Sequence, residues 1–180
     1  MNSNISVILA AAAFAADRHR AQRRKDADAS PYINHPLALA NILSNEGEVH
    51  DTAVLCAALL HDTVEDTETS FEELRERFGE AITAIVAEVT DDKALPKAER
   101  KRLQVLKAPG KSEGAKLVKL ADKISNLRDI LASPPADWPQ KRKVEYFQWA
   151  RDVVAGLRGV NSRLEAAFDE VFERGMKRFV

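Results

Sequence analysis

The spacing of apolar residues constrains the fold of this chain more than any other feature. Along almost the whole sequence, apolar side chains recur at intervals of three and four residues rather than two, which is the period of an amphipathic helix. Gly and Pro, which interrupt helices, number only seven each among 180 residues. The pattern predicts an all-α protein of about nine or ten helices, not a simple four-helix bundle.

Short polar or Gly- and Pro-containing stretches separate the predicted helices. A Ser/Thr start followed by acidic residues is a capping signature within residues 66–79, and Gly79 can end that helix. Pro96 can occupy the first position of the helix within residues 96–108. The other predicted helices are an amphipathic N-terminal helix and segments 37–47, 52–62, 80–92, 115–132, 141–157 and 161–179. Since no repeat or linker interrupts this series, we expect residues 1–180 to form a single domain.

Composition narrows the class of function. A net charge of −1 argues against general binding to nucleic acid or to an acidic membrane, so an anionic ligand must meet a local basic patch. The single cysteine, Cys56, excludes an intramolecular disulfide, and its apolar neighbours predict a small buried hydrophobe. No basic residue precedes the N-terminal apolar stretch, and no apolar run is long enough to span a bilayer. We therefore expect a cytoplasmic protein without a membrane partner.

The stretch AALLHDTVEDTETSFEEL, residues 57–74, places a group of polar side chains at the end of an apolar run. His61 and Asp62 terminate the run, and Glu65 and Asp66 follow three residues later. A core helix does not normally end in so many groups that are costly to desolvate. The pattern indicates a bound cation.

Two residues distant in sequence can complete a metal site. His35 lies between a loop and an apolar helix, and Asp122 interrupts an otherwise apolar helical face. A set of two imidazoles and two carboxylates suits Mn²⁺, Fe²⁺ or Co²⁺ better than structural zinc, and it leaves positions for water and substrate. The remaining histidines, His19 and His50, are interpreted as a solvated surface residue and a loop residue.

A simpler interpretation remains open at this point. His61 and Asp62 would only cap a helix end, while Asp122 would pair with Lys119 or Arg128. The His-Asp dipeptide alone does not decide between the two interpretations. The distant Asp122 and the nearby acidic pair favour the metal site.

Four motifs resemble a known family. The segments YINHP, ALLHDTVEDT, VTDDKALPKAERK and GAKLVKLADKISNLRDI resemble the HD-domain hydrolases of the RelA/SpoT group, in particular the small stand-alone alarmone hydrolases related to metazoan SpoT homologues. The likeness runs from about Phe14 to the last predicted helix. It implies a single HD-type helical fold.

The resemblance also assigns roles to residues. It implies Mn²⁺ as the metal and a catalytic pair at Glu65 and Asp66, which would activate or position the attacking water. The implied metal ligands are His35, His61, Asp62 and Asp122. The implied substrate-binding residues are Arg24, Lys25, Tyr32, Lys97, Asn126, Trp138, Arg142 and Tyr146. Without the resemblance, the RRKD, KAERKR and YFQW segments would be interpreted as solvated helix surfaces or core packing.

The implied reaction is removal of the 3′-diphosphate from guanosine 3′,5′-bis(diphosphate) or its pentaphosphate form. A second activity implied by the resemblance is removal of the 2′-phosphate from NADPH, since both substrates carry a phosphorylated ribose hydroxyl. The alternative of another class is a non-catalytic nucleotide-binding HD module. Because the chain has no room for a synthetase domain or a regulatory region, we expect no ribosome partner, and the net charge predicts no nucleic-acid partner.

Overall fold

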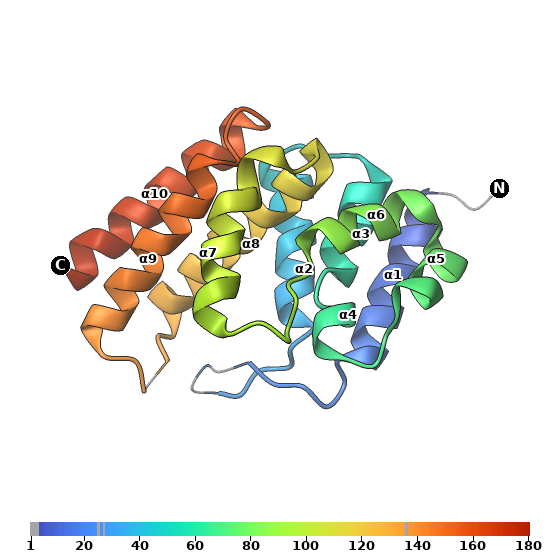
Figure 1. The fold of residues 1–180 in the computed structure, drawn as a ribbon, viewed down its shortest axis with the longest axis horizontal. Helices are drawn as coiled ribbons and strands as arrows, with labels where there is room; N and C mark the ends of the chain where they lie inside the picture. The colour runs from blue at the N-terminus through green and yellow to red at the C-terminus, as the bar shows by residue number, and fades with distance from the viewer. Residues whose placement is uncertain (1–3, 25, 27, 136) are drawn as a thin grey trace.

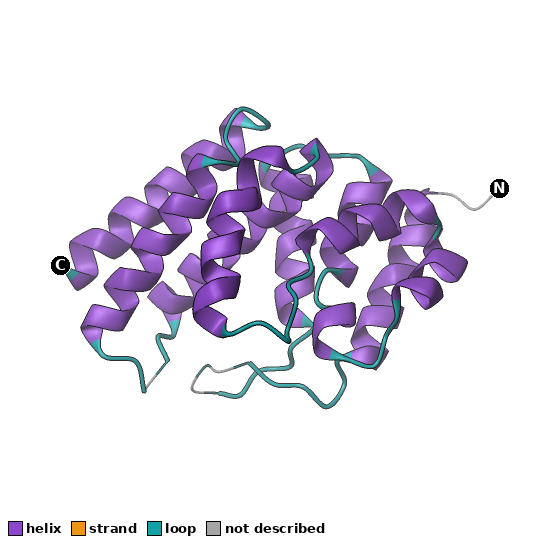
Figure 2. Cartoon of the chain, in the orientation of Figure 1, coloured by secondary structure: helices purple, strands orange, loops and turns teal. Residues whose placement is uncertain are grey.

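The computed structural model describes residues 4–24, 26, 28–135 and 137–180, and in these residues it contains helices but no strand (Figure 2). The described residues form ten α-helices: α1 (Asn4–Arg18), α2 (Asn34–Asn41), α3 (Thr52–Leu60), α4 (Thr63–Asp66), α5 (Phe71–Phe78), α6 (Glu80–Val89), α7 (Lys97–Lys107), α8 (Glu113–Ala132), α9 (Gln140–Ala155) and α10 (Ser162–Phe179). A π-helix, Ile42–Glu46, extends α2, and a short 3₁₀ helix, Ala108–Gly110, follows α7. The predicted all-α class and number of helices are confirmed.

Local capping explains where several helices begin and end. Ser70 precedes α5, and its hydroxyl accepts a hydrogen bond from the Glu73 N–H at 3.1 Å, as the capping signature predicted. Gly79 separates α5 from α6 with φ of 84°, a left-handed conformation that favours glycine. Pro96 lies immediately before α7 rather than at its first position, so that prediction was displaced by one residue.

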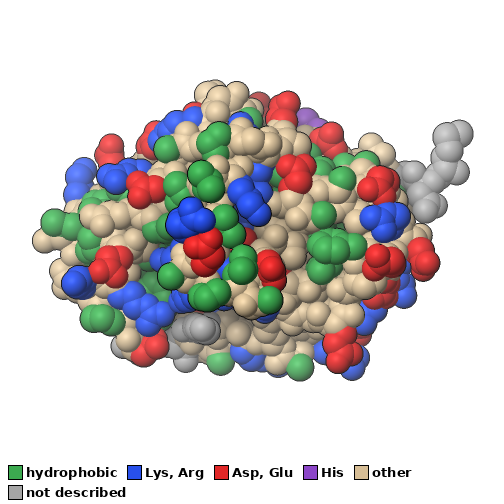
Figure 3. All heavy atoms as spheres, viewed as in Figure 1, with side chains coloured by type: hydrophobic (Ala, Val, Ile, Leu, Met, Phe, Trp, Pro, Cys, Tyr) green, Lys and Arg blue, Asp and Glu red, His purple; other side chains and the backbone are tan. Residues whose placement is uncertain are grey.

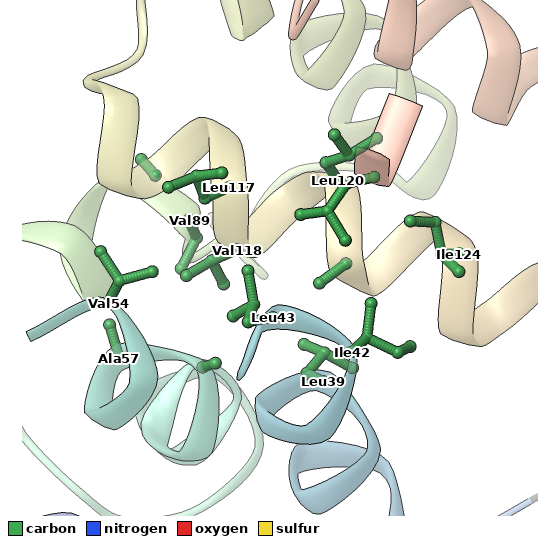
Figure 4. Close-up of a cluster of buried hydrophobic side chains, with 14 of the residues drawn as sticks. Leu39, Ile42, Leu43, Val54, Ala57, Val89, Leu117, Val118, Leu120 and Ile124 are labelled. Carbon is green, nitrogen blue, oxygen red and sulfur yellow. The ribbon is translucent and has the colours of Figure 1, made fainter. Parts of the chain in front are cut away.

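Helices α3 and α8 form the centre of the molecule (Figure 1). Every residue of α3 from Val54 to Leu60 is buried, because this segment is apolar on all sides and can only be stable when surrounded. Helix α3 packs against α1, α2, α6 and α8, and α8 also contacts α9 and α10. Figure 4 shows side chains from α2, α3, α6 and α8 converging on one apolar cluster.

Two local features differ from the sequence-based expectations. The first helix ends at Arg18, and the chain then turns, so His19 packs into the interior with 2% of its surface exposed. The prediction of a solvated His19 was therefore wrong, because the helical spacing does not continue through this segment. The one-turn helix α4 was also not predicted, since four residues are too few for a periodic pattern. His50 is exposed outside the helices and Cys56 is fully buried, as predicted.

The surface matches the near-neutral composition. On the face drawn in Figure 3, Lys and Arg side chains are interspersed with Asp and Glu, and no sign of charge dominates the view. None of the described helices combines the length and apolar character needed to cross a bilayer. Buried apolar side chains of the first helix, α1, and of the last, α10, belong to one cluster.

Candidate active site

The end of α3 supplies the first two polar groups of the site. His61 follows the last residue of α3, and Asp62 precedes the first residue of α4. The His61 Nδ1–H donates to the Ala58 carbonyl at 2.8 Å, and Nε2 lies 2.9 Å from Asp62 Oδ2. Asp62 makes no capping hydrogen bond with its side chain. Its carboxylate is therefore directed to His61, not used to cap α4.

His35 approaches the same place from the start of α2. Its Nε2 lies 3.3 Å from Asp122 Oδ1, its Nδ1 lies 3.3 Å from Ser125 Oγ, and its ring centroid is 5.3 Å from that of His61. One ligand atom from each of His35, His61 and Asp62 lies within 4.8 Å of the others. This group could hold a divalent metal ion.

Asp122 reaches the site from the middle of α8 and is 8% exposed. Its Oδ1 accepts a hydrogen bond from Asn126 Nδ2 at 2.6 Å, and its Oδ2 accepts one from Lys123 Nζ at 2.9 Å. The predicted alternative partner Arg128 instead forms a two-pronged pair with Glu46 at 2.6 and 2.8 Å. Pairing of Asp122 with Arg128 is therefore excluded by the structure.

The charges and tautomers of these groups fit a cation. Burial alone would raise the pKa of the Asp62 carboxyl, but His61, His35 and the Tyr32 hydroxyl hold it well below its usual range. Burial is likewise outweighed at Asp122, where Lys123 and His35 lower the pKa. An imidazole that donates through Nδ1 and faces an ionised carboxylate through Nε2 requires a proton or a metal ion between them. The donor set thus fits a metal site of mixed nitrogen and oxygen ligands.

Glu65 lies on α4 beside this group. Its Oε2 accepts the Asp91 N–H at 3.2 Å, and its Oε1 lies 3.4 Å from Arg100 Nη1. Burial raises the pKa of the Glu65 carboxyl, although the hydrogen bond from Asp91 opposes the shift. A carboxylate with a raised pKa is suited to accept a proton near neutral pH.

Asp66 follows on the same helical turn but has different partners. Its Oδ2 accepts a hydrogen bond from Gln22 Nε2 at 2.9 Å, and its Oδ1 contacts the Lys93 ammonium. Asp66 lines a neighbouring cavity, whereas Glu65 is not among the lining residues. The two carboxylates are therefore held separately and face different surroundings.

The histidine–carboxylate group consists of the triad His35, His61 and Asp62 together with Asp122, which contacts His35. A cavity with a volume of ≈ 1090 Å³ adjoins this group, because His35 belongs to both. Seven of the eight predicted substrate-binding residues line it: Arg24, Tyr32, Lys97, Asn126, Trp138, Arg142 and Tyr146. The eighth, Lys25, lies outside the described residues. The structure thus brings together residues from the loop before α2 and from α7, α8 and α9 that are far apart in the sequence.

Two aromatic rings and a cation lie close together in the cavity wall. The Trp138 and Tyr146 ring centroids are 5.5 Å apart, and the Arg142 guanidinium lies 4.3 Å from the Trp138 centroid. The YFQW segment divides between two roles, because Tyr146 lines the cavity while the next residue, Phe147, is fully buried in the core. The wall offers stacking surfaces beside positive charge.

Asn126 connects the cavity to the histidine–carboxylate group. Its amide donates to Asp122 at 2.6 Å, and its Oδ1 accepts from Arg24 Nη2 at 3.4 Å. Arg24 also pairs with Asp129 and lies 5.8 Å from the Tyr32 ring centroid, and the Tyr32 hydroxyl donates to Asp62. These contacts therefore connect the cavity wall to the carboxylates of both Asp62 and Asp122.

Sequence reasoning missed three residues of this region. Lys123 is 2% exposed, contacts Asp122 and lies 4.4 Å from the Trp149 ring centroid. Its position directly after Asp122 in a buried segment was a usable signal. Lys101 lines the cavity one helical turn after Lys97, so its spacing could have identified it. Gln22, the partner of Asp66, carried no such signal.

The comparisons with known proteins agree on one family. The HD domain family model matches residues 11–158. A Xenopus tropicalis protein named guanosine-3′,5′-bis(diphosphate) 3′-pyrophosphohydrolase MESH1 is 60% identical over 172 residues, covering 96% of this chain and 96% of its own length. The Homo sapiens protein of the same name is 55% identical over 177 residues, covering 98% and 99% of the two chains.

A solved structure supports the same assignment. It is described as a metazoan ortholog of SpoT that hydrolyzes ppGpp and plays a role in starvation responses. It matches this chain with a TM-score of 0.92 and 48% sequence identity, and the match covers 97% of each chain. This protein therefore belongs to the HD-domain family and is similar over nearly its whole length to metazoan pyrophosphohydrolases.

Proposed function

We propose that this protein is a Mn²⁺-dependent hydrolase that removes the 3′-diphosphate from guanosine 3′,5′-bis(diphosphate) and from its pentaphosphate form. The observation that carries the proposal is the position of His35, which lies both in the histidine–carboxylate group and in the wall of the ≈ 1090 Å³ cavity. A phosphate bound among the cavity cations would thus meet the group at its edge. The names of the similar metazoan proteins support the same substrate.

His35, His61, Asp62 and Asp122 would hold the metal, which supplies positive charge to the reacting phosphoryl group. Two imidazoles and two carboxylates make a mixed nitrogen and oxygen site that suits Mn²⁺, Fe²⁺ or Co²⁺, and Mn²⁺ is proposed among these because the resemblance to the alarmone hydrolases implies it. Tyr32 keeps Asp62 oriented through its hydroxyl, and Asn126 with Lys123 does the same for Asp122. These outer contacts fix the direction of the ligand atoms.

In the proposed reaction, water attacks the phosphorus attached to the ribose 3′-oxygen. A bond forms between the water oxygen and the phosphorus, and the bond between the phosphorus and the ribose 3′-oxygen breaks. Glu65, whose raised pKa suits it to proton transfer, accepts a proton from the attacking water. Asp66, held by Gln22 and Lys93, orients the water. The ribose 3′-oxygen takes up a proton, and pyrophosphate and guanosine 5′-diphosphate are released.

The cavity wall would bind the rest of the nucleotide. Arg24, Lys97 and Arg142 carry the positive charge that a substrate with several phosphates requires. Trp138 and Tyr146 provide aromatic faces on which the base can stack. Because stacking accepts any base, the wall contributes affinity more than base specificity.

Product analysis tests the proposal. The metal-free protein is supplied with Mn²⁺ and guanosine 3′,5′-bis(diphosphate), and the phosphorus products are resolved by ³¹P NMR. We expect pyrophosphate and guanosine 5′-diphosphate, with turnover abolished by a chelator and restored by Mn²⁺. Release of orthophosphate alone, or turnover that survives chelation, would contradict the proposed reaction.

A second candidate substrate is NADPH, with loss of its 2′-phosphate. The size of the cavity favours it, because ≈ 1090 Å³ slightly exceeds the usual volume of small-molecule pockets and leaves room for a dinucleotide. The same assay with NADPH should release orthophosphate under the same metal dependence. Competition between the two nucleotides for one site would show that they share the cavity.

A further inference from the structure

His19 is a buried histidine that the proposed mechanism does not use. It follows α1 and is 2% exposed. Its Nδ1 lies 2.6 Å from Gln22 Oε1, and its ring lies against Tyr32 with centroids 4.8 Å apart and an interplanar angle of 37°. Its Nε2 is buried without a hydrogen-bond partner among the described residues.

The proton positions follow from the Asp66 carboxylate. An ionised carboxylate only accepts hydrogen bonds, so Gln22 must direct its amide N–H to Asp66, at 2.9 Å. The Gln22 carbonyl oxygen then faces His19, and Nδ1 must be the protonated nitrogen. Burial lowers the pKa of His19 and outweighs the raising effects of Gln22, Asp62 and Asp66. The ring is therefore neutral, with its lone pair on Nε2.

Stability does not explain a histidine at this position. A buried acceptor without a partner disfavours the folded state, and an apolar side chain of similar size would avoid that cost. The one polar contact that the His19 ring makes among the described residues is the hydrogen bond from its Nδ1–H to Gln22, and this bond orients the Gln22 amide. The unpaired Nε2 is the consequence of keeping that donor.

We propose that His19 is a positioning residue for the hydrolytic reaction, acting through the chain His19 Nδ1–H, Gln22 Oε1, Gln22 Nε2–H and Asp66. The imidazole prevents rotation of the Gln22 amide, so that its N–H stays on Asp66. The His19 ring also supports Tyr32, whose hydroxyl donates to Asp62. One buried ring therefore orients both Asp66 and the metal-ligand carboxylate of Asp62. The inference rests on the proposed role of Asp66.

Three substitutions separate positioning from packing. His19→Leu fills the space without a donor, His19→Asn retains an N–H near the position of Nδ1, and Gln22→Ala removes the middle of the chain. We expect His19→Leu to lower kcat about tenfold, the scale of lost outer contacts at such sites, with an unchanged or higher Tm. His19→Asn should recover most of kcat, and His19→Leu combined with Gln22→Ala should cost no more than Gln22→Ala alone.

Full kcat in His19→Leu would overturn the inference, as would equal losses in the Leu and Asn variants accompanied by a fall in Tm. The tautomer of His19 can be measured without an activity assay, and it tests the inference independently of the kinetics. Imidazole ¹⁵N shifts should identify His19 as the neutral Nδ1–H tautomer, and an Nε2–H or doubly protonated ring would also overturn the inference. If wild-type protein releases no pyrophosphate, the proposed function fails while the tautomer result still tests the His19–Gln22 contact.

Discussion

The histidine–carboxylate group and the cavity wall are constructed in different ways. His35, His61 and Asp122 are buried, and each has a second contact that fixes its orientation. The wall residues Arg142 and Lys97, by contrast, are exposed and lie near the start of α9 and of α7. Reacting atoms require fixed geometry, whereas a flexible charged substrate can be held by adjustable side chains. We therefore expect changes in the group to remove turnover and changes in the wall to weaken substrate binding.

The largest effect should follow from Asp122→Asn. The substitution keeps the size of the side chain and its contact with Asn126, but it removes the negative charge. We expect loss of bound Mn²⁺ and a fall in kcat/KM of at least about 10³-fold. Metal analysis after gel filtration, together with steady-state kinetics, measures both. Asp169→Asn, at an exposed carboxylate paired with Arg158, is the matched control.

The second effect separates chemistry from metal binding. Glu65→Gln combined with Asp66→Asn removes the proposed proton acceptor and the carboxylate proposed to orient the water, while preserving the shape of both side chains. We expect Mn²⁺ binding to persist and kcat to fall about 10²-fold or more, the usual contribution of general acid–base catalysis. Unchanged turnover in the double variant would remove these residues from the mechanism.

The pH dependence should report on Glu65. A general base must be ionised, so activity is present above its pKa and is lost as the pH falls through it. Because burial raises the pKa of Glu65, this loss should begin at a higher pH than for an exposed glutamate, with about a tenfold fall per pH unit below it. A kcat–pH profile measures the acid limb. The same limb in Glu65→Gln would assign it to another group.

Tyr32→Phe tests whether contacts behind the metal ligands matter. The change removes the hydroxyl that donates to Asp62 and leaves the ring in place. We expect about tenfold weaker Mn²⁺ binding, a smaller effect than that of Asp122→Asn. Titration calorimetry measures the affinity, with Tyr146→Phe as a control because that ring lines the cavity and, among the described residues, its hydroxyl donates no hydrogen bond to a proposed metal ligand.

The smallest effect should come from the wall. Arg142→Ala removes a cation stacked on Trp138 at an exposed position. We expect KM to rise by a factor of about three to ten, with kcat and Mn²⁺ affinity unchanged, because the contact acts equally on substrate and transition state. Arg174→Ala, at an exposed arginine near Glu170, is the control. A tenfold fall in kcat for Arg142→Ala would contradict the claim that the cavity wall acts on substrate binding and not on turnover.

The parts of the molecule that the sequence predicted share a strong local signal. Helical periodicity identified the long helices, and the capping pattern correctly predicted a helix start within residues 66–79 and a helix end at Gly79. Asp122 stood out because a charge within an apolar segment is expensive unless it has partners. The seven described wall residues were predicted only through family resemblance, since Arg142 or Tyr146 alone is indistinguishable from surface or core.

Tertiary contacts account for the failures. His19 seemed solvated because its neighbours are polar, and only the turn after α1 buries it. Gln22 meets Asp66 across 44 residues, and no local pattern encodes that pairing. Arg128 lies six residues after Asp122 on α8, which places the two side chains on different faces of the helix, and it forms a two-pronged pair with Glu46. Such choices depend on which elements pack together, and spacing along one helix does not reveal them.

A single titration tests the central claim most directly. Metal-free protein is supplied with increasing Mn²⁺ while pyrophosphate release from guanosine 3′,5′-bis(diphosphate) is recorded, in parallel with Arg142→Ala at saturating substrate. We predict no turnover without metal, a rise that reaches a plateau at one bound Mn²⁺ per chain, and superimposable curves for the two proteins. Turnover in the metal-free protein, or activity that does not follow bound Mn²⁺, would contradict the account.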